Sequence, residues 1–480
     1  MLAEIAVATF TQKYRELYTY QVPIEMESSL QIGMGVLVRF GPRVLDGIVF
    51  KLNHETSTRK LNPILRLVKP QPVLSSWQIA LVDFISSYYA ASLHAAIQTV
   101  SPFAFKDLPT PKPERVISFK AAATPDNKLG PKAKQLLELL ARLQSIPYHE
   151  LTQTHAFGAA TIKSLVTAGL AAASEQLSTR AKLTLPAAEP PFVLTAGQQQ
   201  IFDQIKVDMQ RQPSKFLLMG VTNSGKTEIY LQTIATLIQQ GGSAIMLVPE
   251  IALTPQTVGR FERRFPGQVA LWHSLLTPTQ RARTYRQIQN GEIKVVIGSR
   301  SALFSPLPDL KLIVIDEEHE ISYKQEQNPR YHARLVAEKI SSLRGASLIL
   351  GSATPAVESY AKAQNGEYTL LELPLTINQQ TIASTVSTVD LRDELMANNR
   401  TTLSKALQTA IADNLSKGEQ TILFLNRRGK STCVLCRECG FVYKCPHCDL
   451  PLTLHADGNH AELICHHCGF KQQPDSACPR

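Results

Sequence analysis

The segment Gly220-Val-Thr-Asn-Ser-Gly-Lys-Thr227 restricts the fold of this chain more than any other feature. Two glycines with four residues between them, followed by lysine and a hydroxyl residue, form the P-loop pattern that cradles phosphates at a helix N-terminus. An apolar run at 215–219 precedes the segment and a helical pattern at 228–238 follows it, which is the strand–loop–helix context that the motif requires. The sequence therefore predicts an α/β domain that binds ATP. The expected nucleotide-binding residues are Gly220, Val221, Thr222, Asn223, Ser224, Gly225, Lys226 and Thr227.

A second motif supplies the acids that such a site needs. The apolar run 312–315 leads directly into Asp316-Glu317-Glu318-His319. A solvated acidic helix start is the alternative interpretation, but a strand that delivers two acids downstream of a P-loop favours nucleotide hydrolysis. Lys226 is then expected to reach the β and γ phosphates, Thr227 and Asp316 to hold Mg²⁺, and Glu317 to orient the attacking water. These four residues are the predicted catalytic residues.

Composition and charge limit the class of protein. The chain has 480 residues, of which 44 % are hydrophobic and 19 % charged, as in ordinary globular proteins of several domains. A net charge of +10 favours a polyanionic partner, although the solvated lysines of an ordinary basic protein explain it equally well. No apolar run reaches the ~18 residues that span a bilayer, and the N-terminus lacks a basic region before its apolar residues. We expect a cytoplasmic protein without a membrane partner.

Four regions follow one another along the chain. Residues 1–105 are expected to form a β-rich domain with strands at 3–10, 17–22, 35–40 and 47–52 and a helix at 77–95. A proline-rich linker leads to residues 115–178, where helices at 134–143, 148–152 and 159–168 predict a winged helix or, alternatively, a plain three-helix unit. Residues 190–372 carry the α/β alternation of a parallel sheet. Residues 373–480 are expected to begin a second α/β segment, with strands at 386–391 and 421–425, that the cysteines interrupt from about 433.

All eight cysteines lie between Cys433 and Cys478, and six of them form C-x-x-C pairs. This spacing lets two thiolates of one tight turn face the same zinc ion. Free core cysteines and redox chemistry at the pairs are the alternatives. The predicted zinc ligands are Cys436, Cys439, Cys445, Cys448, Cys465, Cys468 and Cys478.

Further motifs, in order, resemble those of superfamily 2 helicases and more narrowly those of the PriA family of primosomal helicases. They include Val-Pro-Glu250-Ile-Ala-Leu-Thr254-Pro-Gln, Ser-Arg300-Ser-Ala-Leu-Phe, Asp316-Glu-Glu-His319, Ser-Tyr323-Lys-Gln, Arg-Tyr331-His-Ala-Arg334, Gly-Ser352-Ala-Thr354-Pro and Phe424-Leu-Asn-Arg-Arg-Gly. The resemblance covers nearly the whole chain. It implies a RecA-like helicase lobe and a partial second lobe with a zinc-binding insert. These would follow a β-rich domain that binds DNA 3′ ends and a winged-helix domain that binds duplex DNA.

The resemblance also assigns roles to single residues. Among the adjacent Gln198, Gln199 and Gln200, the resemblance favours Gln198 as the residue that reads adenine. His319, Ser352 and Thr354 are expected to couple hydrolysis to strand movement. The expected DNA-binding residues are Tyr18, Tyr20, Arg300, Tyr323, Lys324, Tyr331 and Arg334, in part because aromatic rings stack on bases and cations meet phosphates. For Tyr18 and Tyr20, packing within the sheet is the competing interpretation.

Two departures from the family pattern bear on these roles. Thr19 stands between the two tyrosines where the family has an acid, which bears on recognition of a 3′-hydroxyl. Asn223 stands where the family usually has glycine, but asparagine tolerates left-handed backbone geometry, so we expect the loop to keep its shape.

By the same resemblance, Cys445, Cys448, Cys465 and Cys468 share one zinc ion. Cys436, Cys439 and Cys478 share a second with a cysteine that would fall at position 481, so the second site is expected to lack one ligand. Cys433 is outside the pattern.

The function implied is an ATP-dependent 3′→5′ DNA helicase that recognises abandoned replication forks and initiates primosome assembly. ATP, Mg²⁺ and Zn²⁺ are its implied cofactors. Forked and single-stranded DNA, single-stranded-DNA-binding protein and other primosome proteins are its implied partners, and a monomer is expected. The alternatives are a DNA translocase or uptake motor of the same superfamily, and a fork-binding loader platform without catalysis. Because second-lobe arginines would follow residue 480, we expect residues 1–480 alone to bind ATP and DNA but to hydrolyse poorly.

Overall fold

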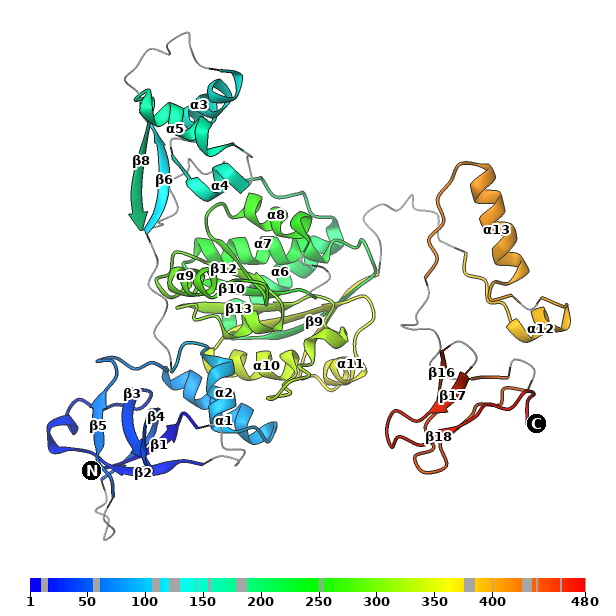
Figure 1. Cartoon of the computed structure of the whole chain (residues 1–480), viewed down its shortest axis with the longest axis horizontal. Helices are drawn as coiled ribbons and strands as arrows, with labels where there is room; N and C mark the ends of the chain where they lie inside the picture. The colour runs from blue at the N-terminus through cyan, green and yellow to red at the C-terminus, as the bar shows by residue number, and fades with distance from the viewer. Residues whose placement is uncertain are drawn as a thin grey trace. The chain divides into compact units, whose positions relative to one another are not determined.

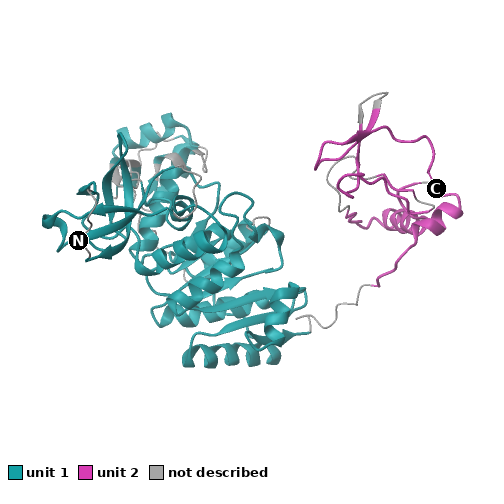
Figure 2. Ribbon diagram, turned by 90° about the horizontal axis from the view of Figure 1, so that it is seen from below, with its two compact units in different colours: residues 1–380 teal, residues 381–480 magenta. Residues whose placement is uncertain are grey.

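The computed structural model of the protein describes residues 1–9, 16–54, 61–105, 113–120, 130–143, 145–153, 157–177, 188–249, 252, 254–374, 385–399, 401–424, 434–436, 439–457 and 460–479. The chain divides into two compact units, Met1–Gln380 and Thr381–Arg480, coloured separately in Figure 2. Among the described residues, no helix is long and apolar enough to cross a bilayer.

The first unit begins with a five-stranded antiparallel sheet in the order β2-β1-β4-β3-β5 (Figure 1). Its strands are β1 (Leu2–Val7), β2 (Tyr18–Gln21), β3 (Gly35–Phe40), β4 (Arg43–Asn53) and β5 (Ile64–Leu67), with a short 3-10 helix η1 (Ile24–Met26) after β2. A two-residue turn joins β3 to β4, and Gly41 there has a φ of +59°, which glycine adopts without strain. The β-rich prediction is confirmed, although β5 was not expected.

Two helices follow this sheet where the sequence pattern predicted one. They are α1 (Ser76–Tyr88) and α2 (Leu93–Val100). Ala90 between them has a φ of +50°, and the hydroxyl of Ser92 accepts a hydrogen bond from Ala95 N at 3.2 Å to begin the second helix. The prediction of a continuous helix over 77–95 was therefore wrong, because a serine cap starts a new helix within the apolar pattern.

Residues 113–177 form three helices and a small antiparallel sheet in the order β7-β6-β8. The elements are β6 (Pro113–Phe119), α3 (Pro131–Leu143), β7 (Ser145–Pro147), α4 (Tyr148–Gln153), α5 (Ala159–Thr167) and β8 (Ala171–Leu177). The fully buried side chains of Leu136, Leu140 and Leu165 hold the helices together. The winged-helix assignment stays a prediction.

A seven-stranded parallel sheet forms the centre of the first unit, in the order β11-β12-β10-β13-β14-β9-β15. Its strands are β9 (Lys215–Gly220), β10 (Ser243–Leu247), β11 (Val269–Trp272), β12 (Val295–Gly298), β13 (Leu310–Ile315), β14 (Ser347–Ser352) and β15 (Thr369–Leu373). Strands β9 and β13 match the apolar runs predicted at 215–219 and 312–315, whereas β11 and β15 were not expected. Parallel strands place all their carboxyl ends, and therefore the P-loop and the acid motif, along one edge.

Helices cover both faces of this sheet (Figure 1). The helices are α6 (Ala196–Arg211), α7 (Lys226–Gln239), α8 (Pro255–Arg264), α9 (Pro278–Gln289), α10 (Ala333–Arg344) and α11 (Val357–Gln364), with 3-10 helices η3 (Arg300–Phe304) and η4 (Ile321–Tyr323). Helices α6, α7 and α8 share one apolar core with one face, and α9 and α10 share another with the opposite face.

Helices α1 and α2 of the N-terminal domain join the core that contains α9 and α10. The rings of Phe103 and Tyr285 meet edge to face with centroids 5.1 Å apart, and the Arg344 guanidinium lies 4.9 Å from the centre of the Trp77 ring. The backbone N–H of His332 donates to the Tyr89 hydroxyl at 3.1 Å. The N-terminal domain and the parallel sheet are therefore packed against each other as parts of one unit.

The second unit contains α12 (Leu391–Met396), α13 (Lys405–Ser416) and a three-stranded antiparallel sheet of β16 (Thr453–Asp457), β17 (His460–Ile464) and β18 (Lys471–Gln472). The predictions of strands at 386–391 and 421–425 were wrong for the residues that the structure describes. Val386 and Phe424 are 86 % and 87 % exposed. An apolar run becomes a strand only when another strand pairs with it, and the described part of 385–424 offers none.

Candidate nucleotide site and zinc centres

The P-loop has the backbone geometry that its sequence predicts. Asn223 and Gly225 have φ values of +60° and +86°, and Ser224 N donates to Val221 O at 3.1 Å. The expectation that asparagine would tolerate this position is confirmed. Helix α7 begins at Lys226 immediately after the loop, so its first N–H groups point toward the loop.

Two side chains of the loop carry donor groups that can bind an anion. Lys226 is only 8 % exposed, and its ammonium group donates to Gly220 O at 2.7 Å. The buried Ser224 hydroxyl has no hydrogen-bond partner among the described residues. A Cβ on Gly220 would lie 2.6 Å from that hydroxyl, so the cradle excludes any larger residue there. This donor set, on the N-terminus of a helix, fits the phosphates of a nucleotide.

Asp316 is placed opposite the loop, at the end of β13. Its Oδ1 accepts a hydrogen bond of 3.2 Å from the Tyr230 hydroxyl of α7. Burial, and next the charge of Glu317, raise the pKa of Asp316 to about 6, whereas Lys226 and the Tyr230 hydroxyl oppose the rise. A buried carboxylate that is costly to ionise and lies near a lysine is suited to a divalent cation.

Two neighbouring positions complete the predicted nucleotide site. Glu317 has a φ of +46°, an uncommon geometry for a non-glycine residue, and such geometry often marks functional positions. Gln198 closes the capping box of α6 with Thr195 and donates from Nε2 to Ser224 O at 2.8 Å. The glutamine thus contacts the P-loop directly, and its reading of adenine stays a prediction.

The predicted coupling residues lie together. His319 Nδ1 is 2.7 Å from the Ser352 hydroxyl, and the same hydroxyl accepts a hydrogen bond from Thr354 N at 3.0 Å. His319 also lies 3.7 Å from a Glu317 oxygen. The end of β14 is therefore connected through one imidazole to the acid motif.

Arg334 has a different environment from the one predicted. Its Nη1 donates to Glu318 Oε2 at 2.7 Å and to Ser359 Oγ at 2.6 Å. Glu318 is 0 % exposed and also accepts from Ala356 N at 2.7 Å. The structure therefore does not support direct DNA binding by Arg334, because this arginine neutralises a buried acid. Sequence reasoning missed this pairing of Glu318, the third residue of the acid motif, because the partners of Glu318 are distant from it in the sequence.

The aromatic loop is also folded inward. Tyr323 is 1 % exposed and its hydroxyl donates to Asp316 O at 2.6 Å, while Tyr331 packs edge to face on Phe304 at 5.3 Å. Neither ring is available for base stacking in this structure, so that prediction is not supported. Lys324 donates to the carbonyl of Arg330 and its ammonium lies over the Tyr89 ring.

Arg300 holds this loop from the end of β12. It donates from Nε to Gln325 Oε1 at 2.6 Å and from Nη1 to Ser322 O at 2.7 Å. Ser322 is followed by Tyr323, whose hydroxyl bonds to the backbone of Asp316. A continuous set of contacts thus joins Arg300 to the acid motif. Glu250 of the helicase-like motif Val-Pro-Glu-Ile-Ala-Leu-Thr-Pro-Gln lies outside the described residues.

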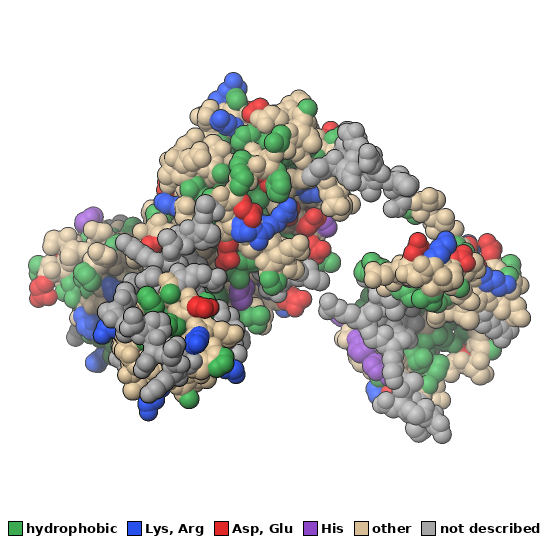
Figure 3. All heavy atoms as spheres, turned by 90° about the horizontal axis from the view of Figure 1, so that it is seen from above, with side chains coloured by type: hydrophobic (Ala, Val, Ile, Leu, Met, Phe, Trp, Pro, Cys, Tyr) green, Lys and Arg blue, Asp and Glu red, His purple; other side chains and the backbone are tan. Residues whose placement is uncertain are grey.

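The tyrosines of the N-terminal sheet favour the packing interpretation. Tyr20 is buried and its hydroxyl donates to Arg39 O at 3.1 Å. Tyr18 meets the Phe40 ring edge to face at 4.8 Å and donates to Glu16. Thr19, between them, is exposed. Basic side chains appear at several separate places on the face drawn in Figure 3.

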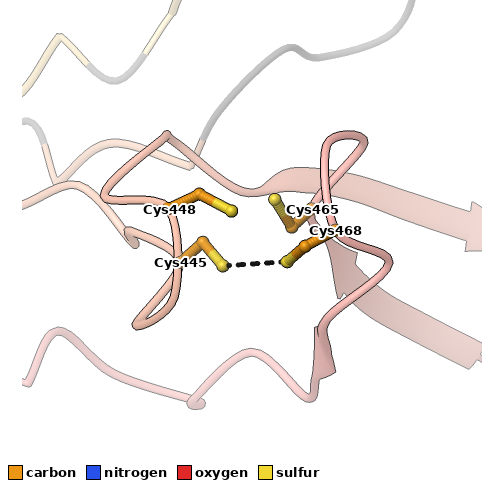
Figure 4. Close-up of side chains that lie close together, drawn as sticks. All are labelled: Cys445, Cys448, Cys465 and Cys468. Atoms are coloured by element: carbon orange, nitrogen blue, oxygen red, sulfur yellow. Dashed lines mark hydrogen bonds between the residues drawn. The ribbon is translucent and has the colours of Figure 1, made fainter.

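The cysteines of the second unit form the two predicted groups. Cys445, Cys448, Cys465 and Cys468 form one, and Cys436, Cys439 and Cys478 form the other, with the sulfurs of each within 4.8 Å of one another. Figure 4 shows the four side chains of the first group pointing toward a common centre. The Sγ atoms of Cys445 and Cys468 are 3.5 Å apart, and those of Cys439 and Cys478 are 3.4 Å apart.

These distances fit zinc. Tetrahedral ligands at ~2.3 Å from an ion lie somewhat under 4 Å from one another. Hydrogen bonds from the backbone N–H groups of Cys468 and His467 lower the pKa of the Cys465 thiol to about 7, whereas hydrogen bonding with Cys468, and next burial, raise the pKa of the Cys448 thiol to about 12. Metal binding releases the protons of the thiols that coordinate the ion. Cys433 lies outside the described residues.

The fold and these sites define a P-loop helicase of the DEAD/DEAH class that carries a zinc-binding region. The model of DEAD/DEAH box helicases matches residues 195–363, that of the 3′ DNA-binding domain matches 4–102, and that of the PriA DNA helicase Cys-rich region matches 445–473. The chain belongs to the PriA family of replication restart proteins.

Two curated relatives agree with this assignment. The replication restart protein PriA of Bacillus subtilis is 35 % identical over 99 % of this chain and 68 % of its own length. The Haemophilus influenzae protein of the same name is 34 % identical over 96 % of this chain and 63 % of its own length. The chain thus spans about two thirds of these relatives. A solved structure of RecG bound to a three-way DNA junction has a TM-score of 0.32 and 26 % identity over 40 % of this chain and 25 % of that one.

Proposed function

We propose that the protein is an ATP-dependent 3′→5′ DNA helicase that recognises stalled or abandoned replication forks and initiates primosome assembly in the cytoplasm. The observation that carries the proposal is the meeting of three features at one sheet edge. These are the P-loop with its buried Lys226, the acid Asp316 and the His319–Ser352 pair. Membership of the PriA family, with its 3′ DNA-binding domain, directs this motor to forked and single-stranded DNA.

The nucleotide would be held by the backbone N–H groups of residues 221–226 and by Lys226, which would exchange its bond to Gly220 O for phosphate oxygens. Thr227 and Asp316 would hold Mg²⁺, which supplies charge neutralisation for phosphoryl transfer. Glu317 would orient the attacking water. Its neighbour His319 would transmit changes at the nucleotide site to the end of β14 through its contact with Ser352.

DNA would act on this site through Arg300. A phosphate that binds Arg300 competes with its bonds to Gln325 and Ser322, and the adjacent Tyr323 is bonded to the backbone of Asp316. Release of the loop would then change the surroundings of the acid and expose the buried rings to single-stranded DNA. This arrangement accounts for a motor that hydrolyses ATP when it holds DNA.

The domain limits 1–105, 115–178, 190–372 and 373–480 are part of the proposal, with duplex binding assigned to the second. The cysteine region would bind Zn²⁺ and support contacts with single-stranded-DNA-binding protein and other primosome proteins.

The test measures ATP hydrolysis by the purified full chain with and without a forked substrate, and binding to forks with and without a leading-strand 3′ end at the junction. Residues 1–480 are expected to hydrolyse ATP slowly, DNA is expected to raise that low rate, and a 3′ end is expected to increase affinity. Lys226→Ala is expected to abolish turnover while fork binding persists. A rate of ATP hydrolysis that DNA does not change, or equal affinity for linear and forked DNA, would contradict the proposal.

A further inference from the structure

A polar cavity of about 410 Å³ lies where the N-terminal domain meets the parallel sheet, and Arg300, Gln325 and Tyr331 of the helicase-like motifs form part of its lining. Gln98 and Thr99 of α2 line it from one side, and the ends of β11 and β12 line it from the other. Its size falls in the range of about 300–1,000 Å³ that is usual for small-ligand sites. Because β11 and β12 are parallel to β9, the cavity opens at the same sheet edge as the P-loop.

The charged side chains that line the cavity are all cationic. The guanidinium groups of Arg281 and Arg300 line it together with hydroxyl and amide side chains, and none of the described residues that line it is acidic. Buried Trp272, Phe304 and Tyr331 provide an apolar wall. A concave surface with cations only and a low-dielectric wall concentrates anions.

Arg281 supplies a donor that the protein itself does not use. Its Nη2 donates to Ser274 O at 3.3 Å, whereas its Nε is buried and has no hydrogen-bond partner among the described residues. A buried guanidinium N–H without an acceptor is costly, and a planar guanidinium matches the oxygens of a phosphate. The unsatisfied donor and the cationic lining therefore point to a phosphate group as the occupant.

We propose that this cavity binds one phosphodiester group of single-stranded DNA as the strand passes between the N-terminal domain and the helicase lobe, with Arg281 as the contact residue. The inference rests on the proposed function, since it places an additional DNA contact beside Arg300. Gln98 and Thr99 of the N-terminal domain would then also contact the strand.

The test measures affinity for a labelled oligothymidylate by fluorescence anisotropy between about 50 and 200 mM salt. Arg281→Gln is expected to weaken binding roughly fivefold to tenfold, the loss of one charge-assisted contact, and to reduce the salt slope by about 0.7. The matched control is Arg283→Gln, which removes the same charge from α9 outside the cavity and is expected to bind within about twofold of wild type.

A second pair of variants leaves the arginines in place. Gln98→Glu introduces an acid at an exposed position that lines the cavity, and it is expected to weaken binding to a similar degree. Its control is Gln289→Glu, the same change at an exposed position at the far end of α9. If Arg281→Gln lowers the thermal midpoint strongly, the Gln98→Glu pair decides.

The outcomes separate this inference from the proposed function. If wild type binds the oligonucleotide and a fluorescent ATP analogue, but the two cavity variants match their controls, the cavity is not a DNA site. If inorganic phosphate at constant ionic strength stabilises wild type but not Arg281→Gln, while DNA affinity is unchanged, the site takes free phosphate and the DNA assignment is overturned. If wild type binds neither DNA nor nucleotide, the proposed function itself fails.

Discussion

The hydroxyl of Tyr230 donates to Oδ1 of Asp316 at 3.2 Å and so ties the helix that follows the P-loop to the strand end that carries the acids. Tyr230 is completely buried, and no motif marks it. Because the bond favours the charged carboxylate, it lowers the pKa of Asp316 against the effect of burial. Tyr230 is thus a positioning residue that holds the acid ready for a metal ion.

Tyr230→Phe is expected to shift the acid limb of ATP hydrolysis to higher pH. Asp316 must be charged to hold Mg²⁺, and with a pKa of about 6 its function falls as the pH drops through that value. Loss of the donor makes the charged form less stable, so the fall begins at a higher pH. The pH profile of DNA-stimulated turnover measures this shift. Tyr360→Phe, the same change on a half-exposed ring, is the control, and identical profiles for the two variants would disprove the role.

Gly351→Ala is expected to destabilise the first unit by about 1–3 kcal/mol. A Cβ at this position would lie 1.7 Å from the Tyr230 hydroxyl oxygen, within backbone that the sheet holds rigidly. Gly197→Ala is the matched control, because a Cβ there meets nothing within 4 Å and lies in a helix, where alanine is favoured. Urea unfolding compares the two. Equal stability would show that Tyr230 moves aside without cost.

Asp316→Asn is expected to raise the stability of the metal-free protein at pH 8. The folded protein raises the pKa of Asp316 from 3.8 to about 6, so ionisation costs the folded state up to about 3 kcal/mol once both states are charged. This cost decreases as the pH falls below about 6 and is absent only well below pH 3.8, where the carboxyl is protonated in both states. Thermal midpoints in the presence of a chelator should therefore differ at pH 8 and converge as the pH falls. A difference independent of pH would contradict the assigned burial effect.

Arg334→Leu is expected to destabilise the helicase lobe by about 3–5 kcal/mol, since it leaves the fully buried Glu318 without its cation. Arg330→Leu removes an exposed arginine from the segment just before α10 and is expected to change stability little. Chemical denaturation distinguishes a structural arginine from a DNA contact. If Arg334→Leu unfolds like wild type and only its DNA affinity falls, the original prediction of a DNA-binding role was correct.

Local patterns predicted the backbone of the site well but not its side-chain partners. The P-loop geometry and the strand before Asp316 follow from contiguous residues, so the sequence was sufficient for them. The pairing of Glu318 with Arg334 and the inward rotation of Tyr323 depend on residues that meet only after the sheet is assembled. The same limit explains the strand wrongly expected at 386–391, because pairing between strands is a long-range property.

The zinc groups are expected to differ in their hold on metal. Cys445 and Cys465 are buried with Leu452 and Leu463 in the core of the second unit, whereas Cys439 and Cys478 are exposed. Among the residues that the structure describes, the first group offers four thiolates and the second offers three. A chelator should therefore remove metal from the second group first, and native mass spectrometry should then detect protein with one zinc ion bound.

Cys465→Ala is expected to lose that tightly held ion and the fold of the sheet β16-β17-β18, because the ion links segments that share little other core. Cys436→Ala should lose only the weaker ion, and Cys433→Ala neither. Wild-type protein without tightly bound zinc, or equal losses in all three variants, would show that these thiols are not metal ligands.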